Sequence, residues 1–118
     1  MTVQPLPDRD DGVRLLCAQG EIDIAVAPTL LPEVPALVES ARGVVLDLSA
    51  VTFFDSAGVR LLDRVARECD RAATPFRAVA PPGSVARRVL DLVGLLDLVA
   101  DDVSAAIGAV QGQGGVQS

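Results

Sequence analysis

The most regular pattern of hydrophobic and polar positions lies in the middle of the chain. An apolar run rich in β-branched residues, Val44 to Val51, predicts a buried strand. A short polar turn at Asp55, Ser56 and Gly58 follows the run, and a helical period begins after the turn. The pattern therefore predicts a strand that delivers a serine to the start of a helix.

The helix after this turn is predicted from the spacing of its residues. Apolar residues recur at steps of three and four along one side, and charged residues fill the other side. The apolar positions are Val59, Leu61, Leu62, Val65, Ala66, Cys69 and Ala73. The pairs Asp63/Arg67 and Arg64/Glu68 lie four residues apart, so each should add a few tenths of a kcal/mol. We expect one face of this helix to pack on a sheet and the other to face solvent.

The turn itself has two interpretations. Aspartate and serine accept hydrogen bonds from the free amides of a first helical turn, and glycine permits a tight turn or the close approach of another molecule. Capping alone would account for these residues, although no Glu or Gln completes a capping box three residues after Asp55 or Ser56. The alternative is a surface that another protein recognises. Capping chemistry taken by itself favours the first interpretation.

Weaker patterns predict the remaining elements. In chain order they are a short edge strand in the first dozen residues, a strand over 13–18 that ends at Gly20, a helix from about Pro32 to before Gly43, a strand over 76–80, a short helix capped by Ser84 and ended by Gly94, a strand over 95–99, and a helix to Val110 capped by Asp101 or Asp102. Strands that alternate with helices predict parallel pairing through right-handed crossovers. We expect residues 111–118, which are polar and rich in glycine, to form a disordered tail.

Composition narrows the kind of core and the kind of partner. The 118 residues fit one domain, and half of them are apolar although only three are aromatic, all phenylalanine. The core should therefore consist mainly of Val, Leu, Ala and Ile. A formal charge of −6 argues against a nucleic-acid surface. Every apolar run falls well short of the ~20 residues of a membrane span, and no signal-peptide pattern opens the chain, so we expect a cytoplasmic protein without membrane insertion.

The sequence gives little support for catalysis or for a cofactor. The chain contains no histidine, which excludes Ser–His and Cys–His nucleophile pairs. Cys17 and Cys69 lie in no CxxC or CxxH pattern, and we expect both to pack as small hydrophobic residues. Neither GxGxxG nor GxxxxGK[ST] occurs. We therefore predict a protein that is not an enzyme and that holds no cofactor and no metal.

Several segments together resemble the STAS domain, which is shared by sulphate transporters and anti-sigma factor antagonists. The matching segments are Gly20–Asp23, Val44–Ser49, Phe54–Gly58, Val89–Leu90 and Gly94–Leu95. The Asp-Ser-x-Gly turn after an LDLS-type strand is the most specific of them. The resemblance covers roughly residues 13–110. It implies a single STAS-like α/β domain over residues 1–110, with a mixed sheet of four or five strands and helices mainly on one face.

The resemblance also implies a function. In the stand-alone antagonists of this family, an ATP-dependent anti-sigma kinase phosphorylates the serine of that turn, which is Ser56 here. The unphosphorylated chain would bind the anti-sigma factor serine kinase and release a sigma factor, phosphorylation would break the complex, and a PP2C-like phosphatase would restore it. The partner-binding residues implied are Asp23, Asp55, Ser56, Ala57, Gly58 and Arg60.

The sequence also departs from the family and leaves an alternative open. A small polar residue, commonly threonine, often follows the GE-x-D segment of the family, whereas this chain has the apolar run Ile24–Pro28. The alternative function is that of an accessory or scaffold subunit of a transporter or stress-signalling complex, without phosphorylation. Among other hydroxyls, Ser49 and Thr52 are expected in or just after a buried strand and Ser84 as a helix cap, which leaves Ser56 as the only regulatory phosphosite.

Overall fold

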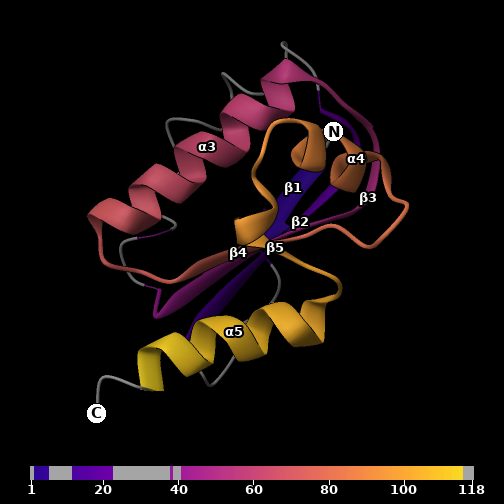
Figure 1. The fold of residues 1–118 in the computed structure, drawn as a ribbon. Coiled ribbons are helices and arrows are strands. Elements are labelled where there is room, and N and C mark those ends of the chain that lie inside the picture. Colours follow the sequence, from indigo (N-terminus) through magenta and orange to yellow (C-terminus); the bar gives the residue numbers. More distant parts are fainter. Residues whose placement is uncertain (1, 6–11, 23–37, 39–40, 116–118) are drawn as a thin grey trace.

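The computed structural model describes residues 2–5, 12–22, 38 and 41–115. Within these residues the chain forms a five-stranded sheet, three α-helices and one 3-10 turn (Figure 1). The strands are β1 (Thr2–Pro5), β2 (Val13–Ile22), β3 (Gly43–Phe54), β4 (Phe76–Val79) and β5 (Val99–Ala100). The helices are α3 (Ser56–Arg71), α4 (Val85–Leu92) and α5 (Val103–Gly115), and the 3-10 turn η2 spans Leu96–Leu98.

The sheet has the spatial order β1-β2-β3-β4-β5, so neighbours in the chain are neighbours in the sheet. β1 pairs with β2 in antiparallel direction, and each later pair is parallel. β3 therefore has a strand on both sides, and its residues Val44, Leu46 and Leu48 are buried. The predicted mixed sheet with a central strand at these residues, and an edge strand near the amino terminus, is confirmed.

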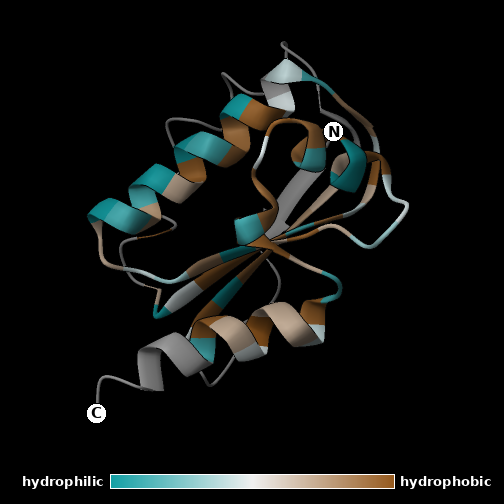
Figure 2. Cartoon of the chain, viewed as in Figure 1, coloured by the Kyte–Doolittle hydropathy of each residue, from teal (hydrophilic) through white to brown (hydrophobic). Residues whose placement is uncertain are grey.

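Helices cover the two faces of the sheet unequally (Figure 1). α3 and α4 lie on one face, above a large core cluster that contains Leu46 and Leu62. α5 lies on the opposite face, above a smaller cluster that contains Val45 and Val110. Two of the three described helices thus share one face, as predicted. Figure 2 shows hydrophilic positions recurring along α3, as expected of a helix that packs through one side only.

α3 packs on the sheet through the predicted stripe. Leu62 and Cys69 are buried, and Ala66 packs against the same cluster. Burial, with a smaller effect of the neighbouring Glu68 carboxylate, raises the pKa of the Cys69 thiol to about 12. The thiol therefore stays protonated at neutral pH and packs as a small apolar group. Cys17 is partly buried and packs against the smaller cluster, so the core placement of both cysteines is confirmed.

The outer side of α3 carries both predicted ion pairs. The Arg67 Nε lies 2.9 Å from the Asp63 Oδ2, and the Arg64 Nη2 lies 3.4 Å from the Glu68 Oε1. Glu68 is buried, and Arg71 contacts its other carboxylate oxygen. The arginines are largely exposed, so solvent screens these pairs and each adds only a few tenths of a kcal/mol.

The capping residues predicted for the start of α4 and of α5, and the glycine predicted at the end of α4, are confirmed. The Ser84 Oγ accepts a hydrogen bond of 3.2 Å from the amide of Arg87, and the Asp102 Oδ1 accepts one of 2.7 Å from the amide of Ala105. Gly94 follows α4 with a φ of +78°, a conformation that favours glycine. Of the predicted helix before Gly43, the described residues include only Val38, Ala41 and Arg42. Val38 is buried in the larger cluster, and Ala41 packs against it.

Three predicted boundaries were wrong. β2 does not end at Gly20 but continues to Ile22, because a shift in register with β3 lets the pairing continue. The predicted strand over 95–99 is a 3-10 turn followed by the two-residue strand β5. α5 passes Val110 and reaches Gly115, so residues 111–115 are helical rather than a disordered tail. Once a helix has formed, each added residue gains one hydrogen bond, so extension is much easier than starting a helix. This allows α5 to continue into the glycine-rich residues.

Two bulges in β3 decide which of its side chains enter the core. Residues 17 and 19 of β2 pair with residues 47 and 50 of β3, and residues 20 and 21 pair with residues 51 and 53, so β3 has one extra residue at each point. Its buried positions therefore step by three, from Leu48 to Val51 to Phe54. Strict alternation from Val51 would bury Phe53 and expose Phe54. The second bulge instead leaves Phe53 46% exposed and Phe54 only 4% exposed.

This difference predicts opposite results for two adjacent phenylalanines. Phe54→Ala removes a buried ring and should lower the free energy of unfolding by about 3–5 kcal/mol. Phe53→Ala removes a half-exposed ring and should cost about 1 kcal/mol or less. Urea denaturation followed by circular dichroism measures both values. Equal losses would contradict the placement of the second bulge.

Candidate functional site

The predicted Asp55–Gly58 turn lies where the central strand β3 meets the first turn of α3 (Figure 1). Asp55 occupies the N-cap position, and its carbonyl accepts the first helical hydrogen bond from the amide of Val59 at 3.1 Å. Ser56 is the first residue of α3 and is exposed. Asp55 therefore holds the N-cap position of α3, and Ser56 stands on the surface beside it.

Gly58 is buried because the ring of Phe54 packs against it. A Cβ atom at this position would lie 2.7 Å from the Cδ1 and 2.8 Å from the Cε1 of Phe54, closer than real Cβ contacts. Gly58 does not have a positive φ. A left-handed backbone conformation is therefore not the reason for glycine at this position. The sequence suggested a tight turn or the approach of another molecule as the reason for this glycine. The structure shows that a ring of the same chain makes the close approach.

The contact between Phe54 and Gly58 ties the end of β3 to the first turn of α3. Both residues are buried, and they lie on either side of Ser56 in the sequence. Ser56 is thus exposed on a short segment whose ends are both anchored in the core. Such a segment loses little conformational freedom when another protein binds it, which favours recognition.

The electrostatic setting of Ser56 suits a negative group. Ser56 is at the amino end of α3, where free amides and the positive end of the helix dipole meet. Arg60 is exposed and lies four residues later on the same helix, a spacing that makes two side chains surface neighbours. A phosphate ester on Ser56 would therefore lie beside two sources of positive potential without becoming buried.

The structure brings together most of the predicted site. The junction between β3 and α3 contains five of the predicted partner-binding residues, namely Asp55, Ser56, Ala57, Gly58 and Arg60. Asp23 lies outside the described residues. β2 runs beside β3 as far as Ile22, which pairs with Phe54, so the carboxyl ends of the two strands meet at one edge of the sheet.

Residues 4–109 match the family model of the STAS domain. The chain belongs to the STAS domain family. This STAS domain is 36% identical over 86 residues to the anti-sigma-F factor antagonist RsfB of Mycobacterium tuberculosis, a match that covers 72% of this chain and 69% of the relative. Over 62 residues it is 39% identical to the putative anti-sigma factor antagonist BtrV of Bordetella bronchiseptica, covering 52% of this chain and 53% of that protein.

Solved structures agree with the family assignment. A crystal structure of an anti-sigma factor antagonist from Mycobacterium paratuberculosis is similar with a TM-score of 0.76 and 32% identity, over 93% of this chain and 95% of that one. The unphosphorylated form of the anti-sigma factor antagonist SpoIIAA has a TM-score of 0.78 at 21% identity, over 94% and 97% of the two chains. At 21% identity, the similarity to SpoIIAA shows a shared fold only. The match to the family model confirms the resemblance to the STAS domain that the sequence showed.

Two hydroxyls of this STAS domain were misplaced by sequence reasoning. Ser49 and Thr52 are exposed, because the bulges turn residues on β3 away from the core. The amide of Ser49 donates a hydrogen bond of 2.9 Å to the Asp47 Oδ1. Burial therefore does not protect Ser49 and Thr52 from a kinase. The feature that distinguishes Ser56 from them is its place in the first turn of a helix.

Sequence reasoning also missed the two residues that shape the site, Phe53 and Phe54. They are identical and adjacent, and the sequence contains no signal that tells which one enters the core. The bulge at Thr52 depends on the register between β2 and β3, which joins residues far apart in the chain. A helix–strand pattern alone therefore identifies the turn but not the side chains that support it.

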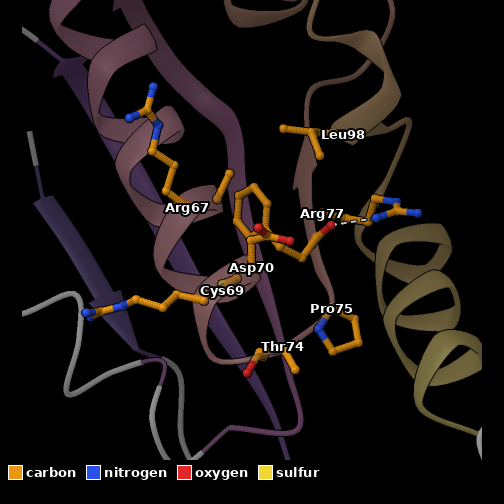
Figure 3. A pocket seen from close by; sticks show the side chains of 11 residues that line it. Arg67, Cys69, Asp70, Thr74, Pro75, Arg77 and Leu98 are labelled. Carbon is orange, nitrogen blue, oxygen red and sulfur yellow. Dashed lines mark hydrogen bonds between the residues drawn. The ribbon is translucent and has the colours of Figure 1, made fainter.

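A groove of about 800 Å³ lies at the other end of α3 (Figure 3). Its lining includes Cys69, Asp70, Phe76 and Leu98, together with three arginines. The arginines are already engaged: Arg67 with Asp63, Arg71 with Glu68, and Arg77 through a hydrogen bond of 2.7 Å to the carbonyl of Phe76. The groove lies at the carboxyl end of α3 and Ser56 at its amino end, so the groove is separate from the candidate site.

Other kinds of site find no support in the described part of the chain. No group of three or more potential ligands there could hold a metal ion. The described helices include none that is long and apolar enough to cross a membrane.

The role of Gly58 can be tested against a second helical glycine. Gly58→Ala should lower the free energy of unfolding by about 1–2 kcal/mol, because the added methyl group overlaps the Phe54 ring and this cost exceeds the gain in helix propensity. Gly108→Ala is the matched control, since an added Cβ there meets nothing within 4 Å. It should raise stability by up to about 1 kcal/mol. Two changes of the same sign and size in urea denaturation would contradict the Phe54–Gly58 contact.

Proposed function

We propose that this STAS domain is an anti-sigma factor antagonist switched by phosphorylation of Ser56. In its unphosphorylated form it binds an anti-sigma factor serine kinase and frees a sigma factor, and phosphorylation ends that binding. The observation that carries the proposal is the exposed Ser56 at the first position of α3, held between the buried residues Phe54 and Gly58. The names of the Mycobacterium tuberculosis and Mycobacterium paratuberculosis relatives support it.

The fold tolerates a phosphate at this position. The group adds about −1.5 to −2 charges near neutral pH. Ser56 is exposed, so the charge remains in water, and the amino end of α3 stabilises a negative group. Asp55 rather than Ser56 occupies the N-cap position, so modification of Ser56 leaves the cap in place. The modified domain should therefore stay folded.

The interface does not tolerate the phosphate in the same way. A partner surface that fits a neutral hydroxyl must remove water from the phosphate oxygens when it covers them. Unless the partner supplies new positive groups, that desolvation costs several kcal/mol, and Asp55 beside Ser56 adds like charge. A fold that persists and a complex that dissociates together make a reversible switch.

The exposure of Ser56 also accounts for the phosphorylation and dephosphorylation steps of the proposed cycle. An exposed serine is accessible to a kinase that uses ATP and to a PP2C-like phosphatase that removes the phosphate. The proposal places the domain in the cytoplasm, where ATP and the sigma factor are found. It acts on transcription through protein partners, and no contact with nucleic acid is required.

Substitutions at Ser56 test the binding step. Each anti-sigma kinase encoded in the same genome is purified and titrated calorimetrically with the wild-type domain, Ser56→Ala and Ser56→Asp. Ser56→Ala should bind like the wild type, and Ser56→Asp should bind at least about tenfold more weakly because its charge stays at the interface. Both variants should melt close to the wild type.

Ser104→Asp is the control for this test. Ser104 is also exposed in the first turn of a helix, α5, so the variant adds the same charge at a helix start outside the junction between β3 and α3. It should bind like the wild type. Equal binding by Ser56→Asp and the wild type would favour an accessory or scaffold subunit, and no binding by any kinase would overturn the proposed function.

Phosphorylation itself gives a second prediction. Incubation with the cognate kinase and ATP should add one phosphate to the wild-type domain and none to Ser56→Ala, as read by intact mass and peptide mapping. A PP2C-type phosphatase should remove it. Comparable labelling of Ser49 or Thr52, which are both exposed, would overturn the assignment of Ser56 as the only regulatory site.

A further inference from the structure

β3 exposes an aromatic ring three residues before Ser56, that of Phe53. The other large hydrophobic residues exposed in the described part of the chain lie on or just after α4 and in η2. They are Val85, Leu92, Val93 and Leu96. Phe53 therefore stands apart from them in sequence, on the strand that leads into the candidate site.

The fold exposes this ring through a specific feature. The bulge at Thr52 turns Phe53 outward and lets Phe54 turn inward onto Gly58. Bulges often re-aim a side chain beside a functional site. The same feature therefore builds the support of Ser56 and exposes an aromatic ring three residues before it in the sequence.

In the described part of the chain, neither core cluster includes Phe53 or the exposed residues of β3 that precede it. The cluster beneath α5 includes Val45 of β3 but no later residue of that strand. Beyond it on β3, Asp47 is partly buried and the residues Ser49, Ala50, Thr52 and Phe53 are exposed. Among the described residues, α5 thus packs on the first part of the strand and not on the part that leads to Ser56.

We propose that Phe53 is an anchor residue by which the anti-sigma partner holds this domain, and this inference rests on the proposed function. Three residues of chain span at most about 11 Å. A typical interface buries about 800 Å² on each partner, equivalent to a disc about 16 Å in radius. A partner surface centred on Ser56 therefore reaches Phe53. The partner presents an apolar pocket to the ring beside a surface that fits the neutral hydroxyl.

The two residues then have separate roles. Buried aromatic side chains near the centre of an interface supply much of its binding energy. The ring of Phe53 carries no charge, so its contribution is present in both states of Ser56. Phe53 supplies affinity, and the phosphate on Ser56 opposes it. Because Phe53 supplies affinity and the phosphate opposes it, a single modification at Ser56 is enough to shift the complex from bound to dissociated.

The test compares two exposed apolar residues in the intact chain. Phe53→Ala should weaken binding to the anti-sigma kinase that binds the wild-type domain by at least about tenfold, mainly through faster dissociation. Phe53→Gln should show the same loss. Val85→Ala is the matched control, because Val85 is 43% exposed and Phe53 is 46% exposed. It should bind within about twofold of the wild type, and melting curves of all three variants check that each is folded.

The outcomes separate this inference from the proposed function. Binding of Phe53→Ala and Phe53→Gln within about twofold of the wild type, while Ser56→Asp is released, would overturn the role of Phe53 and leave the switch intact. An equal loss in Val85→Ala would also overturn it, since the effect would not be specific to Phe53. If the wild-type domain binds no anti-sigma kinase, both proposals fail.

Discussion

The packing of Phe54 on Gly58 is the contact on which the candidate site depends. It joins the end of the central strand to the first turn of α3, and only glycine leaves room for the ring. The contact in turn requires the bulge at Thr52, which points Phe54 into the core. Ser56 has a defined position on the surface because the residues around it are fixed by burial.

The sequence was informative where structure depends on nearby residues. The apolar run at Val44–Leu48 and the helical period after Ser56 predicted the central strand and α3, and Ser84 and Asp102 marked two helix starts. It failed where structure depends on pairing between distant residues. The register of β2 with β3 carries β2 past Gly20, exposes Ser49 and Thr52, and decides between two identical phenylalanines, and no local pattern encodes it.

The family resemblance located the serine, and the structure adds why its position suits a switch. Asp55 occupies the cap position, so Ser56 is not needed to begin the helix. The hydroxyl can therefore change its charge with little effect on the fold. Stability depends on Phe54 and Gly58 inside the domain, whereas in the proposed switch recognition depends on Ser56, with Phe53 as the proposed anchor. Separate residues can thus satisfy the demands of folding and of regulation.

The central claim is that phosphorylation of Ser56 changes binding and not folding. The most direct measurement titrates one anti-sigma kinase with the unphosphorylated and the stoichiometrically phosphorylated domain, and follows amide exchange in β3 and α3 of both forms. We predict at least tenfold weaker binding by the phosphorylated form, with unchanged protection in β3 and α3. Equal binding by the two forms, or loss of binding together with loss of protection in α3, would contradict the account.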